Sequence, residues 1–95
     1  MNVFDALQNW YLTQCNGDWE HEFGIKIDTL DNPGWKVVID LIDTPCENKI
    51  FNKINGQIDE SNWLQCNVKE NKFIGYGGVQ NLIDIIRIFI AWKDT

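Results

Sequence analysis

Residues 23–41 read FGIKIDTLDNPGWKVVIDL and decide the predicted fold. Apolar and polar residues alternate on both sides of a turn signal, which is the pattern of two strands that each bury one face. The turn is Asp31-Asn32-Pro33-Gly34, where proline fixes one φ angle and glycine permits another. The pattern therefore predicts an antiparallel hairpin with strands over 23–28 and 35–41. The side chains expected to face the core are Phe23, Ile25, Ile27, Trp35, Val37, Ile39 and Leu41.

Amphipathic helices are predicted at both ends of the chain. Residues 3–15 carry apolar side chains at helical spacing, and Asn16-Gly17 is expected to end this helix because glycine readily adopts a left-handed conformation. Residues 79–92 form an apolar run whose polar side chains lie in a narrow stripe. This run is long for a strand and contains no turn signal, so we expect a helix that packs centrally on the sheet.

The part of the chain between the hairpin and the last helix gives weaker signals. Thr44-Pro45 and several asparagines interrupt residues 43–62, where Ile50, Phe51 and Ile54 suggest a short strand. Alternation returns at 63–69, followed by a turn and a short strand at 73–74. The prediction is one α+β domain over residues 1–95, with an N-terminal helix, an antiparallel β-meander of four to five strands, and a C-terminal helix packed on one sheet face.

Composition sets the class of protein. A chain of 95 residues has room for one modest core, and 44% hydrophobic residues with five tryptophans fill it without metal or disulfides. Cys15, Cys46 and Cys66 lack CxxC spacing, which favours free thiols in a reducing compartment. We see neither a signal peptide nor a run long enough to span a bilayer, and therefore expect a cytoplasmic protein.

The net charge of −6 is unevenly distributed along the chain. Residues 1–47 hold nine acidic and two basic side chains, a net charge of −7, while residues 48–95 hold six basic and five acidic side chains, a net charge of +1. Such an acidic half repels nucleic acid and attracts a basic partner. Solubility alone is an equally good explanation of the charge.

Residues 14–24, QCNGDWEHEFG, concentrate the groups with potential chemistry. His21 stands between Glu20 and Glu22, and a carboxylate can orient an imidazole for acid/base work. Catalysis would also need a nucleophile or a metal. Side chains adjacent on a strand point in opposite directions, so the neighbouring carboxylates would not face His21 if this segment were a strand. A structural or partner-binding histidine is therefore favoured. Trp19, between two acids, has two interpretations: a binding anchor, or a lid that closes the edge of the core.

Two further patterns have weak functional interpretations. The three cysteines suggest a thiol-dependent enzyme such as a sulfurtransferase, but Glu47 follows Cys46 and the predicted helix ends at Cys15, and both features disfavour a thiolate. Gly75-Tyr76-Gly77-Gly78 resembles a phosphate-binding loop but lacks the Lys-Ser/Thr that such a loop needs. We interpret it as a tight strand-to-helix turn.

Several longer motifs resemble one known family. They are Trp10-Tyr11-Leu12-Thr13-Gln14-Cys15, Gly17-Asp18-Trp19-Glu20-His21, Gly24-Ile25, Thr29-Leu30-Asp31-Asn32-Pro33-Gly34-Trp35, Ile39-Asp40-Leu41, Gly75-Tyr76-Gly77-Gly78, Asn81-Leu82 and Phe89-Ile90-Ala91-Trp92. Together they are similar to the immunity protein 53 family of bacterial polymorphic toxin systems, over residues 10–92. The chain departs from the expected pattern at Val79, where a proline would follow the glycine pair.

The resemblance implies a small α+β protein that is encoded beside a toxin, binds that toxin in the cytoplasm and blocks it stoichiometrically. We expect no catalysis, cofactor, metal, nucleic acid or membrane, and a monomer or weak homodimer; a homo-oligomeric structural module is a further alternative. A nuclease is one toxin whose basic surface would suit the acidic half. The expected partner-binding residues are Asp18, Trp19, Glu20, His21, Glu22, Asp31 and Trp35.

Overall fold

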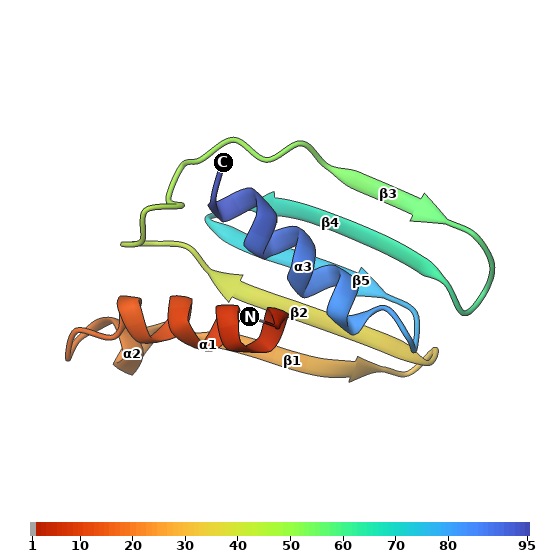
Figure 1. Ribbon diagram of the computed structural model, residues 1–95, viewed down its shortest axis with the longest axis horizontal. Helices are drawn as coiled ribbons and strands as arrows, with labels where there is room; N and C mark the ends of the chain where they lie inside the picture. Colours follow the sequence, from red (N-terminus) through yellow and green to blue (C-terminus); the bar gives the residue numbers. More distant parts are fainter. Residues whose placement is uncertain (1) are drawn as a thin grey trace.

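Two long helices cover one face of a five-stranded antiparallel sheet in the computed structural model, which describes residues 2–95 (Figure 1). The helices are α1 (Val3–Gln14), α2 (Trp19–Glu22) and α3 (Leu82–Lys93). The strands are β1 (Ile25–Leu30), β2 (Gly34–Asp40), β3 (Ile54–Gln57), β4 (Trp63–Lys69) and β5 (Lys72–Gly77). The predicted α+β class is confirmed, with a helix at each end of the chain and α3 packed on the sheet.

The predicted hairpin is present as β1 and β2. Ile25 pairs with Ile39 and Ile27 with Val37, so the apolar positions of both strands share the helix-covered face. β1 begins two residues later than predicted, because Phe23 caps the end of α2 and its N–H donates to the Trp19 carbonyl.

The strand order is β1-β2-β5-β4-β3, which differs from the simple meander that we predicted. After β2 the chain runs along one end of the sheet and returns at the far edge, so β5 fills the place beside β2. The crossing segment is made of turns: the Thr44 hydroxyl donates to the Leu41 carbonyl, and Asp43 and Asn48 have positive φ angles. The third strand therefore lies at 54–57 and not around Ile50 and Phe51.

The predicted strand-to-helix turn at Gly75–Gly78 is wrong in its position. Residues 75–77 belong to β5, and only Gly78 lies outside the strand. A Cβ atom added at Gly75 would overlap the Ile85 side chain of α3. Glycine stands there because the helix approaches the sheet too closely for a side chain.

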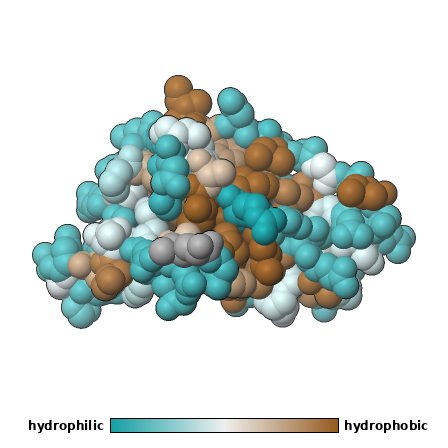
Figure 2. Space-filling model, viewed as in Figure 1, coloured by the Kyte–Doolittle hydropathy of each residue, from teal (hydrophilic) through white to brown (hydrophobic). Residues whose placement is uncertain are grey.

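The core is rich in aromatic rings that contact one another edge to face or at a tilt. Phe89 of α3 lies 5.0 Å from Trp10 of α1 and 5.3 Å from Phe73 of β5, measured between ring centroids. Figure 2 views the helix side, where hydrophobic surface shows between hydrophilic residues. No helix in residues 2–95 is long and apolar enough to cross a membrane.

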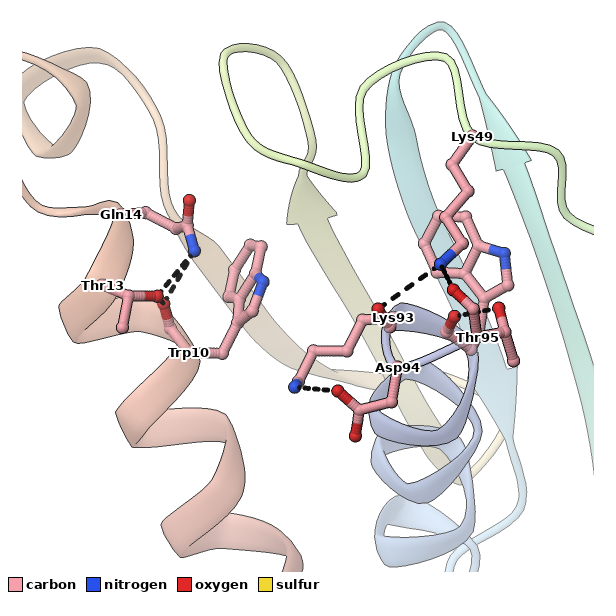
Figure 3. A network of polar contacts seen from close by, with 8 residues as sticks. Trp10, Thr13, Gln14, Lys49, Lys93, Asp94 and Thr95 are labelled. Atoms are coloured by element: carbon pink, nitrogen blue, oxygen red, sulfur yellow. Dashed lines mark hydrogen bonds and ion pairs between the residues drawn. The ribbon is translucent and has the colours of Figure 1, made fainter.

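Polar contacts hold the ends of the helices in place (Figure 3). The buried Gln14 amide donates to the Trp10 carbonyl over 3.1 Å and to the Thr13 hydroxyl over 2.8 Å. At the end of α3, the Lys49 ammonium donates to the Thr95 carbonyl over 2.7 Å. The crossing segment is thereby fastened to the end of the last helix.

Candidate partner-binding site

Residues 16–22 fold into a turn that is closed by its own polar groups. Asn16 Oδ1 accepts from the backbone N–H groups of Asp18 (2.9 Å) and Trp19 (3.0 Å) at the start of α2. The Glu20 carboxylate accepts from the N–H groups of Asn16 and Gly17, both over 2.9 Å, and Gly17 has a φ of 95°. These bonds form a helical turn, so the strand alternation that we applied to His21 and its neighbours does not hold there.

Trp19 lies inside the edge of the core, with 3% of its surface exposed. Its ring packs against Trp10 and Tyr11, each at 6.1 Å between centroids, and its Nε1 donates to the Ile42 carbonyl over 2.9 Å. The structure therefore supports the lid interpretation of Trp19. Too little of its side chain is exposed for Trp19 to fill a pocket of a partner.

The charged groups around this lid remain at the surface. Asp18, His21 and Glu22 are exposed, and no ion pair engages any of them within residues 2–95. Backbone hydrogen bonding, from its own N–H first and then from Asn16 and Gly17, lowers the pKa of the Glu20 carboxyl, which keeps it ionised.

An open groove of about 670 Å³ lies beside α2. It is lined by Leu7, Gln8, Tyr11, Glu20, His21, Glu22, Phe23, Gly24, Ile25, Lys26, Asp40 and Lys72. This lining mixes apolar side chains with both signs of charge, an arrangement that suits recognition of a protein surface. Among residues 2–95, no three His, Cys, Asp or Glu side chains are grouped to hold a metal ion.

The remaining predicted site residues lie at the opposite end of β1. Asp31 is exposed in the β1–β2 turn, and Trp35 Nε1 donates to the Val79 carbonyl over 2.9 Å, which fastens the hairpin to the segment before α3. The six residues of β1 separate this turn from α2 by about 20 Å (Figure 1). The structure therefore does not bring the seven predicted residues into one site.

The cysteines lie apart, and none is in a disulfide within residues 2–95. Burial raises the pKa of Cys66 to about 12 and also raises the pKa of Cys46, so both thiols stay protonated near neutral pH. Cys15 is partly exposed, and its Sγ donates to the Tyr11 carbonyl over 3.3 Å. Neither buried thiol is poised as a nucleophile, which weighs against a thiol-dependent enzyme.

A surface that local sequence patterns did not predict lies on the side of the sheet away from the helices. We call it the basic face, and it is formed by Lys26, Lys36, Lys53, Lys69 and Lys72 around Val38, Ile74 and Tyr76. The alternation of residues 23–41 leaves Lys26, Asp28, Lys36, Val38 and Asp40 on the face away from the core. The pairing of β2 with β5 was the missing fact, because it joins residues about forty positions apart.

Comparisons with known proteins identify the family. The family model for Immunity protein 53 matches residues 4–94, nearly the whole chain. No curated protein and no solved structure matches the chain. The matched range includes all of α1 except Val3, together with the hairpin, the basic face and α3. The chain belongs to the immunity protein 53 family.

Proposed function

We propose that this protein neutralises a bacterial polymorphic toxin by binding it in the cytoplasm as a stoichiometric protein–protein complex. The match to the immunity protein 53 family over residues 4–94 is the observation that carries the proposal. An immunity protein of this kind acts by contact and needs no reaction of its own. The protonated state of Cys46 and Cys66 agrees with that, since neither thiol is activated.

The groove beside α2 is the proposed recognition surface. His21 and Glu22 present exposed polar groups there, and Asp18 is exposed on the same turn just outside the groove lining. Trp19 supports the turn from beneath, and Glu20 fixes its shape. Carboxylates in this position would attract a basic toxin surface, such as that of a nuclease, and raise the rate of encounter. The partly exposed apolar side chains of the groove would then slow dissociation.

Asp31 and Trp35 have different roles in this proposal. Asp31 would meet the toxin only if the complex extends along the whole of β1, because about 20 Å separates the turn from α2. Trp35 would act indirectly by holding the hairpin through its bond to the Val79 carbonyl. Before it meets the toxin, the protein is proposed to be a monomer or a weak homodimer.

Co-expression with the toxin encoded beside this chain tests the proposal. The wild-type protein should restore growth of cells that produce the toxin. Calorimetry should show that Asp18→Asn/Glu22→Gln weakens toxin binding about tenfold. The matched control Asp5→Asn/Glu60→Gln makes the same change in charge away from the groove and should leave the affinity unchanged. Toxicity that persists with folded wild-type protein refutes the function. Equal affinities of the two double variants would move the interface away from the groove.

A further inference from the structure

The sheet face opposite the helices carries an ordered array of side chains. The strand register aligns residues of neighbouring strands in rows across the sheet. One row runs from Asp28 through Lys36 and Tyr76 to Gln65. The next runs from Lys26 through Val38 and Ile74 to Asn67. Neither helix lies on this face, so the array is open to a partner.

The charge of this face is opposite to that of the rest of the molecule. It holds five of the eight basic side chains of the protein, and the strands add two acids on the same side, Asp28 and Asp40. The remainder of the chain holds three basic side chains and twelve acidic ones. A face with net charge +3 therefore lies within a surface of net charge −9.

The lysines of the basic face are poorly neutralised within the molecule. Only Lys72 has a carboxylate partner among residues 2–95, and that partner is Asp40. Lys69 stands directly opposite Lys72 in the β4–β5 register, and like charges at paired positions destabilise a sheet. The Lys36 ammonium lies 5.6 Å from the centre of the Tyr76 ring. Carboxylates from a partner would relieve this repulsion.

The centre of the basic face is apolar and slightly hollow. Val38, Ile74 and Tyr76 are partly exposed side by side on β2 and β5. A shallow depression of about 330 Å³ lies beside them, with Lys53 and Lys69 among its lining residues. An aromatic and aliphatic centre within a charged rim is the usual composition of a protein–protein interface.

We infer that the basic face is a docking surface for an acidic region of the toxin. Charge complementarity favours an acidic surface, and the apolar centre favours a protein. A nucleic acid strand longer than the face would run into the surrounding carboxylates, which repel it. The inference rests on the proposed function and adds to it a second contact, which adjoins the groove beside α2 because Lys26 and Lys72 belong to both.

Neutralising two exposed lysines tests the inference without disturbing the core. Lys53→Gln/Lys69→Gln takes the net charge to −8, and the control Gln80→Glu/Arg87→Gln reaches the same net charge through exposed residues near and on α3. Binding to the toxin encoded beside this chain is measured at several salt concentrations. The lysine variant should bind the toxin about tenfold more weakly, mainly because it associates more slowly. Its affinity should also depend less on salt concentration. The affinity of the control should stay within about twofold of wild type.

Lysine footprinting of the wild-type complex gives a second measurement that needs no variant. Binding of the toxin should protect Lys53 and Lys69 from an amine-reactive reagent and leave Lys93 as reactive as before. Wild-type affinity in the lysine variant, or unprotected Lys53 and Lys69 in the complex, overturns the inference while the proposed function stands. A wild-type protein that fails to bind the toxin at all refutes both, and the two failures are therefore distinguishable.

The same variants test two other possible partners of the basic face, a nucleic acid and a second copy of this chain. Binding of a 20-nucleotide RNA that the lysine variant loses would assign the face to nucleic acid and overturn the inference. Light scattering that shows a wild-type dimer, and a monomeric lysine variant, would assign it to a second copy of this chain and also overturn it. A monomer that ignores the RNA supports the toxin as the occupant.

Discussion

The turn at residues 16–22 and the basic face are both charged surfaces, but their charged groups are held differently. In the turn, Glu20 and Asn16 are engaged by backbone N–H groups and Trp19 is buried beneath them. On the basic face, four of the five lysines have no carboxylate partner within residues 2–95. Much of the turn therefore stabilises the fold, whereas the basic face retains charge that a partner can use.

The comparison shows how proximity in sequence can mislead. Residues 14–24 resembled an active site because polar groups of several kinds follow one another, yet two of them, Asn16 and Glu20, hold the turn together. The lysines of the basic face come from both halves of the chain and are brought together only by strand pairing. Net charge counted along the chain conceals this face, because Lys26 and Lys36 lie within the acidic half.

The largest expected effect tests whether Trp19 belongs to the fold or to the interface. Trp19→Ala should lower the free energy of unfolding by about 3–5 kcal/mol, because it empties a site in the core. Urea unfolding measures the loss. Asp18→Asn, an exposed neighbour, should change stability by less than about 0.5 kcal/mol. A Trp19→Ala protein that keeps its stability and loses only toxin binding would show that Trp19 belongs to the interface and not to the fold.

A substitution in β5, a strand of the basic face, should cause a smaller loss of stability. Gly75→Ala should cost about 1–3 kcal/mol, because the added methyl group meets Ile85 and pushes α3 from the sheet. Thermal unfolding measures the cost. The control Gly56→Ala places a methyl group in open space on β3 and should cost less. Equal stabilities would mean that α3 is not seated closely on β5.

The pH dependence of stability separates structural from free carboxylates. The folded state lowers the pKa of Glu20 below its ordinary value of 4.5. The ionised carboxylate therefore stabilises the fold fully above pH 4.5, and this stabilisation is lost as the pH falls through the pKa of the folded state. Glu20→Gln should therefore lower the melting temperature at pH 7, and the difference from wild type should shrink below about pH 4.5. A difference that is constant from pH 7 to pH 3 contradicts a structural role for this carboxylate.

The smallest perturbation is thiol labelling of the native protein. Cys15, at the start of the turn, should react with a thiol reagent well before Cys46 and Cys66, which are buried and have raised pKa values. Mass spectrometry after partial labelling identifies the order in which the cysteines react. In urea the three cysteines should react at similar rates. Early modification of Cys66 would show that the sheet opens beneath α3.

Local patterns were sufficient to predict much of the fold. The alternation of residues 23–41 predicted the hairpin, residues 63–69 predicted β4, and helical spacing predicted α1 and α3. These signals work because each element buries one face, which fixes its period in the sequence.

The strand order was not predictable in the same way. The place of β5 beside β2 depends on pairing between distant residues, and the turns at 43–48 give no sign of where the chain returns. The role of Gly75 depended on the approach of Ile85, which only the packed structure shows. For the same reason the basic face was not predicted. The partner-binding role of the exposed groups of α2 stays a prediction, and for Trp19 the sequence left the lid and the binding anchor open, of which the structure supports the lid.

A titration of the active toxin with this protein tests the proposed function most directly. Toxin activity should fall linearly with added protein and vanish near one equivalent, and calorimetry should give the same stoichiometry. Full toxin activity in the presence of excess folded protein would contradict inhibition by binding. Loss of activity at a small fraction of an equivalent would also contradict it, since one molecule would then inactivate many.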